Sequence, residues 1–448
     1  MTRFYGKFAA AIAIVLFCCW PAFEAKPAAG AAADARQQAP SSSELVLLRS
    51  MLSDARRLVE QYYYDAKYRG IKVGDRFKEF DARLRTAGSF AEGLLLVDEF
   101  LDGFKDSHTY FIPPLGPEVF EYGYRLLAVG DGVFVRRLKT GSDAAAKLRV
   151  GDQVLAINGL QVSRETLFQV QARFGRLEPR REMRLSLKSP DGALRDAVVV
   201  ADVRPRPPRS LQGWSLQQAG LEEIKAEARE SGLMTARTQV IGEVLFCQFP
   251  SFLGTPDGID AIFREVKKHK ALVLDLRGNP GGFTNVSSRL VTNLFTKTVK
   301  LTERVMRFSR SDETAPGSRG AFTGTLVVLI DARSSSAAEL IARVVQLEHR
   351  GVVIGDRSAG ALMEGVLLTG SRDYGPNMLC EFSITIANLL MADGQALEGL
   401  GVPPDELLLP TAQDLALGRD PVLARAAGLV GLDLDSVAAG KLFPSEWK

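Results

Sequence analysis

Three consecutive serines, Ser334 to Ser336, stand between an apolar run and a predicted helix in the stretch DARSSSAAELIARVVQ. A serine at such a turn can present its hydroxyl as a nucleophile, with the first amides of the helix close by to stabilise an oxyanion. The same residues also suit a structural role, because Ser336 and Glu339 three residues later form a helix capping pattern. The rest of the sequence must decide between the two.

A glycine-rich turn precedes these serines in the stretch LDLRGNPGG, Leu274 to Gly282. Glycine amides are unhindered by side chains, so this turn and the helix after Ser336 could both donate to an oxyanion. Glycines after a strand are also common in ordinary turns. Both turns, however, lie where apolar strand-like runs alternate with amphipathic helices, which predicts an α/β core. Strand-to-helix turns of such cores often carry functional residues.

The motifs VLDLRGNPGG, SSSAAEL, GVVIGDRSAG and LEGLGVPPD follow the order and spacing found in the S41 serine peptidases. The chain therefore resembles this family, which includes the C-terminal processing peptidases and the tricorn-like enzymes, across residues 240–405. The resemblance implies a core similar to the crotonase and Clp protease fold, with Ser336 as the nucleophile. It also implies an oxyanion hole built from the amides of Gly282 and Ala337, with Gly281 as the alternative donor.

The chain departs from the processing peptidases at the general base. Those enzymes use a lysine after the VVIG strand, whereas counting from Ser336 without gaps places Ala361 at that position, and residues 301–440 contain no lysine. A Ser–Lys dyad is thus excluded unless a distant lysine folds in. Histidine is the natural alternative because its ordinary pKa is near neutrality. His269 and His349 lie at charged helix ends, where a solvated role is expected, which leaves His108.

His108 lies in the stretch DSHT, which resembles the histidine motif of the tricorn-like branch. That branch also implies a glutamate before the pattern Gly-x-x-Pro-Asp, and Glu398 occupies this place. A carboxylate that holds the far ring nitrogen fixes the tautomer of a histidine and stabilises its imidazolium form. Glu364 is the competing acid. Ser107 either bridges His108 and Glu398 as part of the catalytic group or is only a turn residue.

The elements that must position these residues divide the chain into six segments. Apolar residues at helical spacing predict helices before residue 103, and alternating patterns predict strands after residue 118. The expected fold class is a multidomain α/β protein with an N-terminal helical domain, a PDZ-like β-rich domain and a crotonase/Clp-like α/β peptidase core. The polar stretch 307–322 is expected to be a solvated loop. The segments are a signal peptide (1–33), a flexible leader (34–43), the helical domain with the histidine (44–112), the PDZ-like domain (113–205), the S41 peptidase core (206–412) and a C-terminal helical tail (413–448).

The PDZ-like domain is indicated by the stretch LRVGDQVLAING, Leu148 to Gly159, which resembles PDZ domains of the bacterial protease-associated type. This resemblance implies that an extended peptide end is captured by strand addition, with its carboxylate held by backbone amides. The receiving loop would contain Tyr122, Gly123 and Tyr124. A PDZ-like fold whose groove is closed or used internally is the alternative.

Composition excludes several function classes. The chain has 56 Lys and Arg against 53 Asp and Glu, without the basic block typical of a nucleic-acid binder, so no nucleic-acid partner is expected. We find no metal-ligand cluster and no phosphate-binding glycine loop, and therefore expect no metal and no cofactor.

Arg3 and Lys7 precede an apolar run, Phe8 to Trp20, that predicts an export signal and a periplasmic or extracellular location. An uncleaved membrane anchor is the alternative.

These observations predict an exported serine endopeptidase that cleaves polypeptides through an acyl-enzyme, with Ser336, His108 and Glu398 as its catalytic group. The PDZ-like domain would recruit or gate the polypeptide substrate, whose C-terminal end is the candidate point of recognition. The alternative is a catalytically silent S41 scaffold that binds a peptide or another ligand, and the missing lysine motivates it. A third reading is an esterase that acts on small acyl substrates with the same triad.

Overall fold

The computed structural model describes residues 39–114, 116–206, 235–370, 380–444 and 447. The signal peptide predicted over residues 1–33 lies outside this part of the chain. Helix α1 (Ser42–Tyr62) begins inside the segment predicted as a flexible leader, because Ser41 caps it. The Ser41 amide donates to the Glu44 carboxylate at 2.8 Å, and the Glu44 amide donates to the Ser41 hydroxyl at 3.3 Å.

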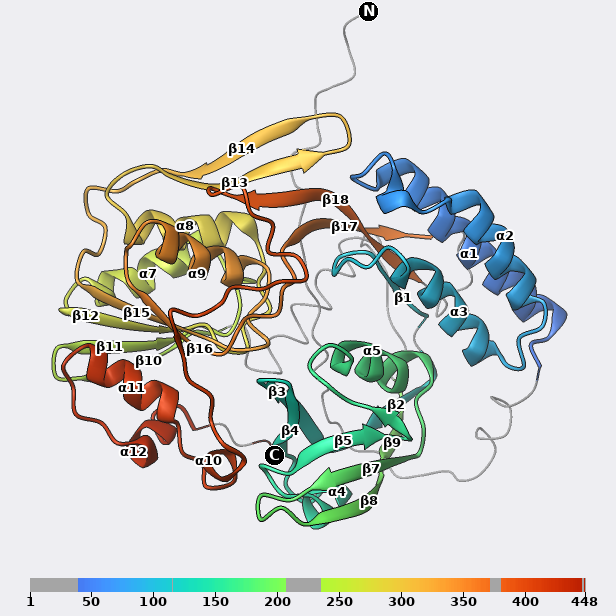
Figure 1. The fold of residues 1–448 in the computed structure, drawn as a ribbon, viewed down its shortest axis with the longest axis horizontal. Helices are drawn as coiled ribbons and strands as arrows, with labels where there is room; N and C mark the ends of the chain where they lie inside the picture. Colours follow the sequence, from blue (N-terminus) through green and yellow to red (C-terminus); the bar gives the residue numbers. More distant parts are fainter. Residues whose placement is uncertain (1–38, 115, 207–234, 371–379, 445–446, 448) are drawn as a thin grey trace, which may run out of the picture.

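The N-terminal helices pack around an apolar core of their own. Helices α1, α2 (Val73–Leu84) and α3 (Phe90–Asp102), with the short turn η2 (Tyr68–Gly70), surround this core. The chain then passes His108 and forms β1 (Tyr110–Ile112), which pairs with β18 (Glu381–Met391). Phe382 and Ile384 of β18 belong to the same apolar cluster as the helices. The helical domain is therefore joined to a sheet of the peptidase segment directly after the histidine (Figure 1).

A β-rich domain follows the helices, and it contains a hairpin near its end. Strands β7 and β8 form this hairpin, and the larger sheet has the order β3-β4-β5-β7-β8 with β6 beside β5. Strand β3 is one of the two edge strands of that sheet, and β2 pairs with β9 in a separate ribbon. The elements are β2 (Glu118–Glu121), β3 (Tyr124–Val129), β4 (Gly132–Leu138), α4 (Asp143–Lys147), β5 (Gln153–Ile157), β6 (Leu160–Gln161), α5 (Leu167–Ala172), η3 (Arg173–Leu177), β7 (Glu182–Lys188), β8 (Leu194–Val200) and β9 (Asp202–Pro205).

A central sheet forms the α/β core, with the order β10-β11-β12-β15-β16-β19. All neighbours pair in parallel except β10 and β11. Helices α7, α8 and α9 cover one face, and α11 and α12 cover the other (Figure 1). The residues predicted as a C-terminal tail therefore complete the core. The elements are β10 (Arg237–Ile241), β11 (Val244–Gln248), α7 (Pro256–Val266), β12 (Ala271–Asp275), α8 (Thr284–Leu294), β15 (Thr325–Ile330), α9 (Ala337–Leu347), β16 (Val352–Gly355), β19 (Glu406–Leu407), α10 (Ala412–Ala416), α11 (Pro421–Leu429) and α12 (Ser436–Gly440).

A second sheet lies beside this core and carries β1. Its order is β1-β18-β13-β14, with β17 (Met363–Thr369) also paired to β18. Strand β13 (Val299–Met306) forms a hairpin with β14 (Arg310–Ala315). The prediction of a solvated loop over residues 307–322 is therefore wrong for residues 310–315. These residues form an edge strand, whose side chains are mostly polar and therefore lack the apolar alternation that predicts a strand.

Candidate active site

Ser336 occupies a constrained turn between β15 and α9. Its backbone has φ 53° and ψ −118°, a left-handed conformation that costs a non-glycine residue roughly 1–3 kcal/mol. The two preceding serines hold the turn in place. The Ser334 hydroxyl donates to the Leu276 carbonyl at 2.8 Å, and the Ser335 hydroxyl donates to the Pro280 carbonyl at 3.0 Å. These two hydrogen bonds join the serine turn to the glycine-rich turn.

The glycine-rich turn approaches Ser336 closely. A Cβ atom added at Gly281 would lie 2.7 Å from Ser336 Cβ and 3.1 Å from the Ala337 amide nitrogen. The Gly281 amide already donates to Asn279 Oδ1 at 2.8 Å. The amides of Gly282 and Ala337 make no hydrogen bond to a described residue, so these two amides remain available for an oxyanion and Gly281 does not.

Glu339 organises the turn from within the protein. It is fully buried, and its carboxylate accepts hydrogen bonds from the amides of Ser336 (3.0 Å), Gly360 (2.7 Å) and Ala361 (2.8 Å) and from the Ser358 hydroxyl (2.6 Å). Burial raises the pKa of this carboxyl, while the four donors oppose that shift. Ala361, at the position where a lysine was sought, also accepts from the Ser336 amide through its carbonyl.

His108, Ser107 and Glu398 form one hydrogen-bonded group. The Ser107 hydroxyl donates to Glu398 Oε2 at 2.9 Å and lies 2.7 Å from His108 Nδ1, and the Ser107 amide donates to Glu398 Oε1 at 2.6 Å. When Glu398 is ionised, the single hydroxyl proton is directed to its carboxylate, and Ser107 accepts from Nδ1–H. This tautomer leaves the lone pair of His108 Nε2 free. Nε2 is buried and has no hydrogen-bond partner among the described residues.

Burial moves the two titratable groups in opposite directions. It lowers the pKa of His108 to about 4, against the opposing charge of Asp106, so the imidazole is neutral at pH 7. It raises the pKa of Glu398 to about 7, although the two hydrogen bonds from Ser107 oppose the shift. The carboxylate form of Glu398 therefore becomes dominant only above neutral pH.

Asp106 anchors the histidine segment and was not singled out from the sequence. Its carboxylate accepts from the Tyr63 hydroxyl at 2.7 Å, from the His108 amide at 3.2 Å and from the Thr385 hydroxyl. The histidine segment is thus tied both to α1 and to β18. The pattern Asp-x-His, typical of a turn in which the aspartate accepts an amide two residues on, is the signal that could have found it.

The competing acid Glu364 is engaged elsewhere. Its carboxylate forms a bidentate ion pair with Arg304, at 2.5 and 2.6 Å. Its neighbour Gly365 does lie against the histidine, because an added Cβ would be 3.1 Å from His108 Cβ. The structure therefore brings Glu398, and not Glu364, into hydrogen-bond contact with Ser107.

Ser336 and His108 are both almost inaccessible, with 5% and 1% exposure. No hydrogen bond joins them in the part of the chain that the structure describes. Both groups border the segment after β16: the Ser336 amide binds the Ala361 carbonyl, and the amide of Gly399, next to Glu398, donates to the Gly360 carbonyl at 2.8 Å.

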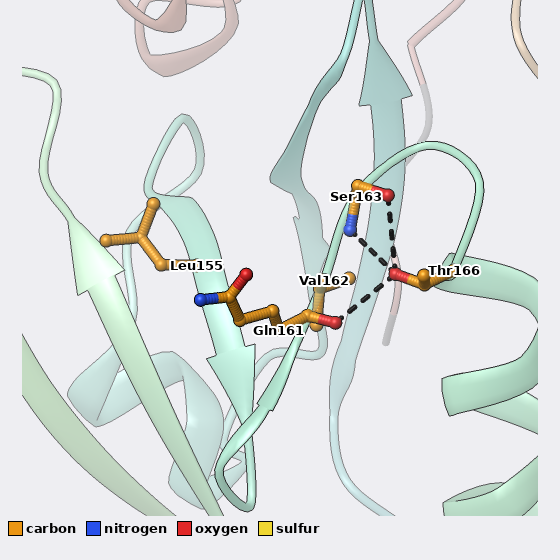
Figure 2. A pocket seen from close by; sticks show the side chains of 5 residues that line it. All are labelled: Leu155, Gln161, Val162, Ser163 and Thr166. Atoms are coloured by element: carbon orange, nitrogen blue, oxygen red, sulfur yellow. Dashed lines mark hydrogen bonds between the residues drawn. The ribbon is translucent and has the colours of Figure 1, made fainter.

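The loop expected to receive a peptide carboxylate makes internal contacts. The Gly123 amide donates to Glu121 Oε1 at 3.0 Å, and the Tyr122 hydroxyl donates to the carbonyl of Arg180 at 2.9 Å. A pocket in the same domain is lined by other residues and contains none of the predicted site residues (Figure 2). The lining residues are Leu155, Gln161, Val162, Ser163 and Thr166.

The described residues contain no cluster of three or more His, Cys, Asp or Glu side chains placed to hold a metal ion. Over the same residues, no helix is long and apolar enough to cross a membrane.

Solved structures with this arrangement of elements define the class of fold. The chain superimposes on mature CPAF with a TM-score of 0.62 at 16% identity, covering 84% of this chain and 95% of the other. It superimposes on the photosystem II D1 C-terminal processing protease with a TM-score of 0.52 at 18% identity, covering 90% and 100%. The chain thus has the mixed α/β multidomain fold of these structures.

The sequence comparisons add homology to a peptidase family. Residues 243–408 match the model of peptidase family S41. The chain is 26% identical over 404 residues to a tricorn protease homolog of Streptomyces coelicolor, and 29% identical over 167 residues to the carboxy-terminal processing protease CtpA of Bacillus subtilis. These alignments cover 85% and 37% of this chain. The chain spans about a third of the length of both relatives, 32% and 34%. Homology to the S41 peptidases is therefore confirmed, while the type of catalytic group stays a prediction.

Proposed function

We propose that this protein is a serine endopeptidase whose catalytic group is Ser336, His108 and Glu398, with Ser107 bridging the last two. The observation that carries the proposal is the hydrogen-bonded series from Glu398 through Ser107 to His108 Nδ1, which leaves Nε2 buried and unpartnered. A neutral imidazole with a free Nε2 lone pair is the form that a general base requires.

In the proposed reaction, Ser336 Oγ attacks the carbonyl carbon of a peptide bond while its proton passes to His108 Nε2. The amides of Gly282 and Ala337 bind the oxyanion of the tetrahedral intermediate. The imidazolium then gives its proton to the departing amine, and an acyl-enzyme on Ser336 remains. Water hydrolyses this ester by the same proton transfers in reverse, and Glu398 stabilises each imidazolium through Ser107.

The proposal extends to the β-rich domain and to location. Residues 113–205 resemble a PDZ domain, and the internal contacts of the Gly123 amide favour gating of the substrate over capture of a free carboxylate at this loop. Near-complete burial of Ser336 supports the same role, because a polypeptide needs a rearrangement to reach it. The apolar run near the N-terminus supports an exported, periplasmic or extracellular enzyme.

Labelling with a fluorophosphonate probe tests the proposal. The wild type should acquire the label, and Ser336→Ala should lose it completely. His108→Ala should label at least a hundred-fold more slowly, since general-base catalysis contributes about 10²–10⁴ in rate. Ser334→Ala is not a suitable control because Ser334 holds the turn, so the exposed Ser43→Ala serves instead. Unchanged labelling of His108→Ala would contradict the assigned base.

The silent binding protein remains the second candidate, because Ser336 and His108 share no hydrogen bond and Ala361 replaces the lysine of the processing peptidases. The same measurement separates the two. A correctly folded wild type that takes up no label, and whose circular dichroism and unfolding temperature match those of Ser336→Ala, would favour the binding protein.

A further inference from the structure

A tryptophan near the end of the sequence rests on an edge strand of the β-rich domain. The guanidinium of Arg125, on β3, lies over the Trp447 ring, 4.0 Å from its centroid. The Thr140 amide, in the turn after β4, donates to the Trp447 carbonyl at 3.0 Å. Trp447 is therefore held by a cation–π contact and by a main-chain hydrogen bond, the two kinds of contact that recognise an aromatic residue in an extended peptide.

The chain is anchored again shortly before Trp447, on a different domain. Arg237, at the start of β10, donates to the Pro444 carbonyl at 2.7 Å, and its guanidinium lies 5.4 Å from the centroid of the Phe443 ring. Phe443 and Pro444 are thus attached to the central sheet, and Trp447 is attached to the β-rich domain. The contact at Trp447 joins the two domains.

The contact lies beside the loop that follows β2. Thr140 is the neighbour of Lys139, whose amide donates to the Gly123 carbonyl. The Gly123 amide itself is bound to the buried carboxylate of Glu121, to which Arg125 also donates at 3.4 Å. A peptide carboxylate placed at Gly123 would face the charge of Glu121, which opposes its binding. The aromatic side chain is the feature of a ligand that this surface can recognise.

We propose that Arg125 and Thr140 form a binding site for an aromatic residue of an extended polypeptide, and that Trp447 fills this site as an internal competitor. A polypeptide with an aromatic residue must displace Trp447 in order to bind. This proposal rests on the proposed peptidase function only in regarding that polypeptide as a substrate, because the binding event itself does not involve Ser336.

Binding of a separate peptide that copies residues 441–448 of the chain tests the site. The probe is a fluorescent peptide with the sequence KLFPSEWK, blocked at both ends, and its partner is the same peptide with alanine in place of tryptophan. All proteins carry Ser336→Ala, so the peptide is not cleaved and binding is measured by fluorescence polarisation without reference to catalysis. Four proteins are compared. The first carries Ser336→Ala alone, and the second adds Trp447→Ala to empty the site. The third and fourth add to this second protein either Arg125→Ala, which removes the cation, or the control substitution Arg184→Ala.

Removal of Trp447 should increase the affinity for the tryptophan peptide at least ten-fold, because the internal competitor is gone. Arg125→Ala should reverse that gain about ten-fold, as expected for a desolvated cation–π contact, whereas the exposed Arg184→Ala should not. If Trp447→Ala lowers the unfolding temperature strongly, Trp447→Leu replaces it, since leucine keeps apolar bulk without an aromatic face. Equal binding by the chains with and without Trp447, or equal binding of the two peptides, would overturn the proposal. Failure of fluorophosphonate labelling in the wild type would instead count only against the peptidase.

Discussion

At the scale of single residues, the candidate site depends on the protonation of a buried pair. Burial holds the pKa of His108 at about 4 and that of Glu398 at about 7, so both groups are predominantly in their unprotonated forms only above neutral pH. Ser107 links the two groups by hydrogen bonds, so we expect the pH dependence of activity to report on the protonation of both.

We expect kcat/KM to rise with pH and to reach half of its maximum near pH 7. A pKa raised to about 7 means that Glu398 is protonated below this pH, and a protonated carboxyl cannot stabilise the imidazolium. Glu398→Gln should lower kcat/KM by about a hundred-fold and should remove the inflection near pH 7, leaving only the titration of His108 at lower pH. A pH series of initial rates, with the exposed Glu182→Gln as a control, checks this. An inflection that survives in Glu398→Gln would assign it to another group.

Short motifs in the sequence predicted Ser107, His108 and Glu398 as one group, and the structure joins these three residues by hydrogen bonds, while their catalytic role stays a prediction. It could not identify Asp106 or Glu339 as organisers of the site. Glu339 is recognisable locally as a capping residue, yet three of its four donors are Ser358, Gly360 and Ala361, about twenty residues away. Such partners are set by the tertiary fold, which local spacing does not encode.

At the scale of elements, the alternation of strands and helices predicted the α/β core, since buried parallel strands read as continuous apolar runs. Pairing between distant segments was not predictable in the same way. Strand β1 has three residues, and its partner β18 lies about 270 residues further along the chain. The packing of α11 on the central sheet was missed for the same reason, whereas the edge strand β14 was missed because its side chains are polar.

The glycine-rich turn offers a test at this scale. Gly282 has φ 144°, and an added Cβ would lie 2.4 Å from the Phe252 carbonyl carbon. Gly282→Ala must therefore push the turn away from the segment that follows β11 and misalign its amide, with an expected cost of about 1–3 kcal/mol in the free energy of unfolding. Fluorophosphonate labelling should slow by about 10²–10³-fold if the Gly282 amide serves the oxyanion.

Gly254→Ala is the matched control for this substitution. Gly254 lies in the segment after β11, has no positive φ, and an added Cβ there would meet no atom within 4 Å. Chemical unfolding and labelling rates of the two variants, measured side by side, separate a specific effect from a general one. A Gly282→Ala protein that labels at the rate of Gly254→Ala would remove Gly282 from the oxyanion hole.

At the scale of the whole molecule, the β-rich domain contacts the segment that supports Ser336. The guanidinium of Arg164, in the loop before α5, donates to Asp356 at 3.0 Å, to the Ser358 carbonyl at 3.1 Å and to the Arg357 carbonyl. Both members of the ion pair are more than 90% buried. Ser358 in turn donates to Glu339, which binds the Ser336 amide. A short series of contacts thus connects the β-rich domain with the serine turn.

Arg164→Ala should therefore affect stability and activity together. In this variant, the buried Asp356 carboxylate keeps the Gly130 amide as a hydrogen-bond donor but loses its cationic partner. Removal of one partner of a buried ion pair lowers the free energy of unfolding by about 3–5 kcal/mol. Arg289→Ala is the control, because Arg289 forms an ion pair with Asp260 while 45% of its side chain is accessible to solvent. This substitution should lower the free energy of unfolding by less than about 1 kcal/mol. Denaturant unfolding of the two variants measures this difference, and a double-mutant cycle with Asp356→Asn isolates the coupling energy.

If the β-rich domain gates the site, Arg164→Ala should also change kcat of the folded enzyme, whereas Arg289→Ala should not. A loss of stability with unchanged kcat would make Arg164 a purely structural bridge between the domains.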